Sequence, residues 1–90
     1  MKEDRIDRIR SRIQAALTPE SVEVVDESHL HEGHEGAQDG RGHFQVVVVS
    51  SDFEGKTRIQ RHRMVFEAVG NLMSTDIHAL GVKAYTPEEI

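Results

Sequence analysis

A helical pattern followed at once by a strand pattern, within residues 61–87, constrains the fold of this chain more than any other stretch. Six apolar side chains in its first half recur at i, i+1, i+4, i+5, i+8 and i+9, which predicts a helix of about three turns with a broad apolar stripe. The stripe consists of Met64, Val65, Ala68, Val69, Leu72 and Met73. Because this stripe is too wide to leave in water, other parts of the chain have to cover it.

The second half of the stretch alternates like a β-strand, starting two residues after Asp76. Alternation places successive side chains on opposite faces of a sheet. One predicted face carries His78, Leu80, Val82 and Ala84, and the other carries Ala79, Gly81, Lys83 and Tyr85. We therefore expect a histidine at the start of the strand, beside the end of the helix.

Three more elements are predicted upstream. Residues 3–17 carry isoleucines at helical spacing and predict an amphipathic helix that ends at Thr18 and Pro19, with its arginines on a solvated outer face. Residues 21–25 predict a first strand, and residues 43–50, with four consecutive valines, predict a central strand antiparallel to it. Thr57 and Gln60 have the spacing of a capping box at the start of the second helix.

This order of elements, α-β-β-α-β, predicts an α+β fold in which a three-stranded mixed sheet carries both helices on one face. Ninety residues can build one core, so we expect a single domain over residues 1–90. Residues 28–42 are rich in glycine and polar side chains and show no apolar periodicity. They predict a long, flexible, exposed loop between the first two strands, a kind of segment that is often functional or mobile.

Composition excludes several classes of function. The chain has no cysteine, which excludes disulfides, a thiolate nucleophile and an iron–sulfur cluster held by its own sulfur. Sixteen acidic against eleven basic residues give a net charge of −5, so nucleic-acid binding would need a local basic patch. The sequence has neither a nucleotide-binding glycine motif nor a recognisable catalytic triad, and we expect no enzymatic activity.

The sequence also bears on location. Its longest apolar run, residues 46–49, is too short to cross a bilayer, and its start has the pattern of neither a signal peptide nor a transit peptide. We expect a cytoplasmic protein, most simply of a bacterium, with no membrane partner. A mitochondrial location stays open for a chain whose leader has been removed.

Six histidines are the main chemical feature of the sequence. Three of them, His29, His31 and His34, have the spacing H-x-H-x-x-H on the predicted loop. Imidazole binds zinc-like metals well, but structural zinc sites use four ligands at fixed spacing. From the spacing alone these three are solvent-exposed side chains in preference to metal ligands, and His78 is a packing residue in preference to a ligand. We expect structural roles for His43 and His62.

Several separated blocks of the sequence resemble the BolA family, in the family's order and over about residues 5–88. The blocks are Val24-Val25-Asp26-Glu27-Ser28, His43-Phe44 before the valines, Phe53-Glu54-Gly55, Arg61-His62-Arg63-Met64-Val65-Phe66, His78-Ala79-Leu80 and Thr86-Pro87-Glu88. The resemblance implies a BolA-like fold, a relative of the class II KH topology with the same order of elements.

The resemblance also implies a partner and a cofactor. BolA-like proteins pair with monothiol glutaredoxins and share a [2Fe–2S] cluster, in cluster trafficking or iron homeostasis. The family's ligands are the histidine of the His-Ala-Leu block, here His78, and a loop histidine or cysteine, for which His31 matches best. The chain departs from the family in its approach to His43, so His34 and then His29 are the alternates. The partner's active-site cysteine and the thiol of glutathione would complete the ligands.

The resemblance implies no cofactor in the isolated apo protein, which we expect to be a monomer or a weak homodimer.

DNA binding is the second hypothesis. Lys56, Arg58, Arg61 and Arg63 crowd the start of the second predicted helix, where the helix dipole favours a phosphate. BolA-like proteins have also been described as transcriptional regulators. The G-x-x-G loop of KH modules is not matched, because residues 33–36 lie between strands and carry an acid. The same basic turn could instead meet an acidic partner or the carboxylates of glutathione.

Overall fold

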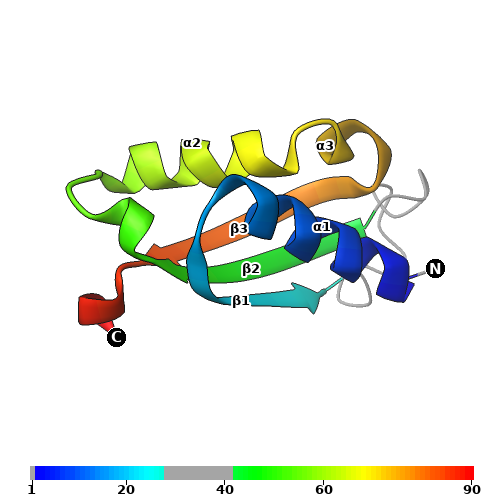
Figure 1. Cartoon of the computed structure of the whole chain (residues 1–90). Coiled ribbons are helices and arrows are strands. Elements are labelled where there is room, and N and C mark those ends of the chain that lie inside the picture. Colours follow the sequence, from blue (N-terminus) through cyan, green and yellow to red (C-terminus); the bar gives the residue numbers. More distant parts are fainter. Residues whose placement is uncertain (1, 28–41) are drawn as a thin grey trace.

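A computed structural model describes residues 2–27 and 42–90. The predicted loop of residues 28–42 lies outside the described residues apart from Gly42. None of the described helices is long and apolar enough to cross a bilayer. The elements are α1 (Lys2–Ala16), β1 (Pro19–Asp26), β2 (Gly42–Ser50), α2 (Arg58–Val69), α3 (Leu72–Thr75) and β3 (Ile77–Tyr85), with 3₁₀ turns at Ser51–Phe53 and Pro87–Glu89 (Figure 1).

The three strands form one mixed sheet in the order β1-β2-β3. β1 runs antiparallel to β2, and β3 runs parallel to β2. Both long helices lie on the same side of this sheet, which leaves its other face without a covering helix in the described part of the chain (Figure 1). The predicted α+β architecture, with β2 in the middle, is confirmed.

The core lies between this face of the sheet and the two helices. Burial alternates along β2, where Phe44, Val46 and Val48 are almost completely buried. They pack against the predicted apolar stripes, including Ile9 and Ile13 of α1 and Val65 and Val69 of α2. Phe53 of the first 3₁₀ turn, which no stripe predicted, belongs to the same core. The alternation continues into β3, where Leu80, Val82 and Ala84 are partly buried against the same core. The apolar periodicity of the sequence thus sets which face of each element is covered.

The second helix begins as predicted and ends earlier than predicted. Thr57 and Gln60 form both hydrogen bonds of a capping box, with distances of 3.1 and 2.9 Å. The helix stops at Gly70, whose φ of 54° lies in the left-handed region that favours glycine. The single long stripe is therefore divided, and Leu72 and Met73 belong to the separate short helix α3.

Three arginines of α1 contact other elements, although Arg8 and Arg12 remain exposed as predicted and only Arg5 of the three is half-buried. Arg8 donates to a carboxylate oxygen of Asp76 at 2.8 Å, and Arg5 lies 3.9 Å from the other oxygen. Arg12 donates to the side chain of Asn71 at 3.0 Å. Because Asp76 is only 8% exposed, its carboxylate requires charged partners, and α1 supplies them. These contacts fix the corner between α3 and β3.

Candidate functional site

A β-bulge at the start of β3 determines how His78 is presented. In the pairing with β2, Gly42 lies opposite Ile77 and His43 lies opposite Ala79. One step along β2 thus corresponds to two along β3, and His78 is the extra residue. Ile77 is completely buried, whereas His78 is exposed.

This bulge corrects the predicted alternation of the strand. The sequence pattern placed His78 on the same face as Leu80 and Val82, which pack against the core. The core position at this end of the strand is instead filled by Ile77, whose aliphatic side chain has no polar group to satisfy. The extra residue then turns its imidazole to the surface.

A second imidazole lies beside that of His78. The ring centroids of His43 and His78 are 4.9 Å apart, and the ring planes are inclined by 40°. His43 comes from β2 and is half-buried, with its Nε2 atom shielded from solvent. Two nitrogen heterocycles from neighbouring strands therefore meet at one end of the sheet. The sequence predicted a structural role for His43 and left open a place near the partner interface.

The chain leaves and re-enters the sheet at this same end around the segment that carries three further histidines. It follows Glu27, whose amide donates to the carbonyl of His43 at 2.8 Å, and it precedes Gly42, whose amide donates to the carbonyl of Asp76 at 3.0 Å. The histidines themselves lie outside the described residues, so their assignment as ligands stays a prediction. They are His29, His31 and His34.

The described side chains can hold part of a metal centre. Among residues 5–27 and 42–90, no group of three or more histidine, aspartate or glutamate side chains is arranged to bind one metal ion. The pair of His43 and His78 can supply imidazole nitrogens, but the chain has no thiolate to add. This donor set fits the non-sulfur part of a cluster site that another molecule would complete.

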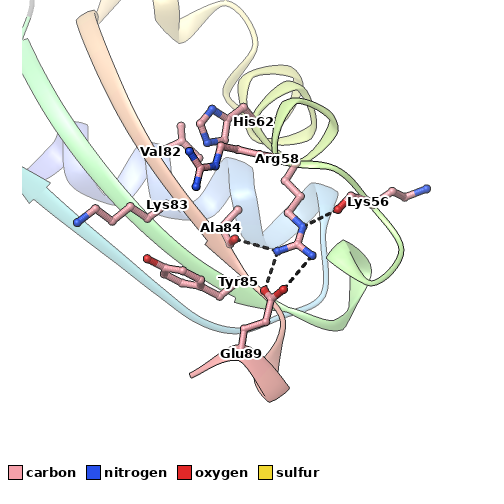
Figure 2. Close-up of a pocket in the computed structure, with 9 residues that line it drawn as sticks. Lys56, Arg58, His62, Val82, Lys83, Ala84, Tyr85 and Glu89 are labelled. Carbon is pink, nitrogen blue, oxygen red and sulfur yellow. Dashed lines mark hydrogen bonds and ion pairs between the residues drawn. The ribbon is translucent and has the colours of Figure 1, made fainter.

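A second site, the basic groove, lies at the opposite end of β3. It is a hollow of about 640 Å³ between the start of α2 and the last residues of β3 (Figure 2). Its lining residues are Lys56, Arg58, Arg61, His62, Val82, Lys83, Ala84, Tyr85 and Glu89. Three of the four predicted nucleic-acid-binding residues thus lie together, and Arg63 is exposed on α2 outside the groove.

Arg61 is occupied by the chain itself. Its guanidinium donates to both carboxylate oxygens of Glu89, at 2.7 and 3.2 Å, and to the carbonyl of Ala84 at 3.2 Å, while its Nε donates to the carbonyl of Lys56 (Figure 2). The hydrogen bonds from Arg61 to the Glu89 carboxylate, followed by one from the Thr86 amide, lower the pKa of Glu89 to about 2. Arg61 therefore holds the C-terminal 3₁₀ turn against β3.

Comparison with known proteins identifies the family. The family model described as "BolA-like protein" matches residues 13–89. The chain belongs to the BolA family. It is 40% identical over 83 residues to the DNA-binding transcriptional regulator BolA of Escherichia coli, which covers 92% of this chain and 76% of that protein. It is 42% identical over 81 residues to BolA-like protein 1 of Mus musculus, covering 90% of this chain and 57% of that protein.

Solved BolA domains share the fold. The BolA domain of SufE1 from Arabidopsis thaliana has a TM-score of 0.82 and 35% identity, and covers 96% of this chain and 95% of that domain. The solution structure of mouse BolA1 has a TM-score of 0.76 and 40% identity, and covers 94% of this chain and 67% of that one. The predicted BolA-like fold is confirmed, and its relation to the KH topology stays a prediction.

Several BolA-family relatives are much longer than the matched region. This chain spans 24% of the SufE-like protein 1 and 56% of the chloroplastic protein BOLA1, both of Arabidopsis thaliana. The match to each covers more than nine-tenths of this chain. The shared part is therefore the BolA domain, and the activities of the longer proteins are not carried over with it.

Proposed function

We propose that this BolA-family chain binds a monothiol glutaredoxin and contributes His78 and one further histidine to a [2Fe–2S] cluster that the two proteins share. The role is non-catalytic, in iron–sulfur cluster trafficking or iron homeostasis. The observation that carries the proposal is the exposure of His78 at the bulge of β3. A ligand to a cluster that is completed by a second protein has to be reachable from outside, and this imidazole is.

The second ligand is proposed to be His31, with His34 and His29 as the alternates. Support comes from the attachment of their segment, because Glu27 and Gly42 at its two ends both lie beside the pair of His43 and His78. The cysteine of the glutaredoxin and the thiol of glutathione would supply the remaining two ligands. When bound, such a cluster provides a one-electron redox centre or serves as the cargo that is transferred.

His43 has a positioning role in this proposal. Its ring contacts that of His78, and its place on the central strand limits its own movement. Groups that contact a ligand from behind fix the orientation of the ligand and thereby tune the metal site. His43 is therefore expected to hold the imidazole of His78 in the orientation that the cluster needs.

The test is cluster reconstitution on the complex with a monothiol glutaredoxin and glutathione. We expect His78→Ala and His31→Ala to lose the visible absorption and circular dichroism of the shared cluster. His62→Ala is the matched control, since this histidine lies on α2 in the basic groove. If both ligand variants give wild-type spectra, the assignment of ligands is wrong. If His78→Ala loses the cluster spectrum and His31→Ala keeps it, the second ligand is His34 or His29.

DNA binding is the second candidate, supported by the name of the Escherichia coli relative and by the clustering of Lys56 and Arg58. Two observations count against it. Arg61 is engaged by Glu89, and the net charge of the chain is −5. A DNA complex should weaken steeply with added salt and with Arg58→Ala. Absence of any complex with duplex DNA at low salt would remove this candidate.

A further inference from the structure

The outer edge of β3 is open in the described part of the chain. β3 pairs with β2 on one side, and among residues 2–27 and 42–90 no strand pairs with its other side. The carbonyl of Ala84 points away from β2, toward Arg61 of α2 (Figure 2). In a parallel strand, backbone groups two residues apart face the same way, so those of Val82 and Leu80 face this open edge too. Unpaired edge groups of this kind are a template for a further strand.

The basic groove runs along this edge and concentrates positive charge on an otherwise acidic protein. Lys56, Arg58 and Lys83 line it and form no ion pair within the described residues. Glu89 is the only acid among the lining residues, and its charge is matched by Arg61. Three positive charges therefore remain to attract an acidic ligand.

The contact between Arg61 and Glu89 indicates the chemistry that fits the groove. The carboxylate of Glu89 receives two parallel hydrogen bonds from one guanidinium, the geometry in which arginine recognises carboxylates. The chain thus already places one carboxylate at the end of the groove. Arg58 offers a second guanidinium on the neighbouring part of the wall.

We propose that the basic groove is the docking site of an extended acidic peptide segment of a partner protein. The segment adds to the open edge of β3 through backbone hydrogen bonds at Leu80 and Val82. Its carboxylates lie against Arg58 and Lys83. Strand addition supplies affinity through the backbone and specificity through the side chains, and here the specificity is for negative charge.

Two other occupants fit less well. A second copy of this chain would bring its own Lys83 to the same edge, and like charges oppose such pairing. Duplex DNA has no groups that continue a β-sheet, and the central guanidinium of the groove, that of Arg61, is already bonded to Glu89. An acidic strand can hydrogen-bond to the open edge of β3 and also pair with the cations that Glu89 does not neutralise, those of Lys56, Arg58 and Lys83.

The groove is separate from the proposed cluster site. Ala84, at the far end of the groove, lies six positions after His78 along β3, which corresponds to about 20 Å. The backbone contact proposed at Leu80 lies two positions after His78, so peptide binding by His78→Ala tests whether the two sites are independent. The inference thus goes beyond the proposed function and can be tested on the apo chain.

The test is an NMR titration of the ¹⁵N-labelled apo chain with a short blocked peptide of alternating glutamate and valine. We expect amide shifts at Leu80 and Val82, with added protection of these amides from exchange. Arg58→Ala combined with Lys83→Ala should weaken binding about fivefold, the effect of losing two exposed ion pairs. Arg63→Ala is the matched control, because this arginine lies on α2 outside the groove, and it should bind as the wild type does.

The other outcomes decide against the proposal. Shifts confined to other surfaces, equal binding of a lysine-valine peptide, or no binding at all would each overturn it. A DNA duplex that shifts the groove residues when the peptide does not would assign the groove to nucleic acid. His78→Ala should bind the peptide normally, so loss of the cluster and loss of peptide binding are separable results.

Discussion

His43 and His78 bring their imidazole rings to within 4.9 Å between centroids although they are not paired across the two strands. The pairing partner of His43 is Ala79. His78 is the extra residue of the bulge, and this places its ring beside that of His43. An exposed side chain at the end of a small sheet would otherwise be loosely held. The half-buried ring of His43 gives it a defined neighbour.

Replacing His43 should therefore alter the cluster site without abolishing it. In His43→Ala we expect a cluster to form with a monothiol glutaredoxin, with an altered visible circular dichroism and about tenfold weaker retention. His78→Ala should not form the shared cluster. The measurement is chelator competition followed by circular dichroism, and a wild-type spectrum in His43→Ala would show that the ring contact has no positioning effect.

The bulge also makes a prediction about stability. Ile77→Ala removes a completely buried side chain and should lower the free energy of unfolding by about 3 kcal/mol. His78→Ala changes an exposed side chain and should lie within about 0.5 kcal/mol of the wild type. Urea unfolding of both variants measures this difference. The reverse ranking would mean that His78, rather than its neighbour, occupies the core.

Much of the fold could be predicted because its determinants are local in the sequence. The capping box of Thr57 and Gln60 needs only residues three apart, and the four valines of residues 46–49 identify a central strand by themselves. The bulge at His78 does not depend on local sequence alone. It results from the burial of Ile77 in the core together with the register in which β3 pairs with β2. The end of α2 at Gly70 was missed because the apolar spacing continues across it.

The candidate site was predictable in its composition and only partly in its arrangement. The sequence indicated His78 and the cationic start of α2, but the contacts that decide their roles come from distant residues. Arg61 binds Glu89, which is 28 positions away in the sequence. The ring of His43 contacts that of His78 because of the bulge. One signal was available for the former, because Thr86 and Glu89 have capping-box spacing and predict an ordered terminal turn.

The contacts of α1 predict unequal roles for its arginines. Among the described residues, Arg8→Ala leaves the nearly buried carboxylate of Asp76 with Arg5 as its one, more distant, ion-pair partner, and should cost about 1 to 2 kcal/mol of stability. In the described part of the chain Arg10 pairs with the exposed Asp7, at 3.7 Å, so Arg10→Ala should cost less than about 0.5 kcal/mol. Denaturant unfolding at neutral pH compares the two variants. Equal costs would contradict a structural role for the Asp76 contact.

The ion pair of Arg61 and Glu89 makes stability depend on acid pH. The pKa of Glu89 in the folded chain is lowered to about 2 from an ordinary value of 4.5, chiefly by hydrogen bonds from Arg61. A carboxyl group whose pKa is depressed by folding stabilises the folded state fully above its unfolded pKa. That contribution is lost as the pH falls from about 4.5 toward 2.

Glu89→Gln should accordingly be less stable than the wild type at pH 7, and the gap should close as the pH falls through this window. Because the Glu89 side chain is 43% exposed, added salt should narrow the gap at pH 7 as well. Unfolding by urea at a series of pH values measures the gap. In an Arg61→Ala background the same substitution should show a weaker pH dependence, since the largest cause of the depressed pKa is gone while the hydrogen bond from the Thr86 amide remains. A gap that stays constant from pH 7 to pH 2 would mean that the Arg61 contact does not stabilise the folded chain through the charge of Glu89.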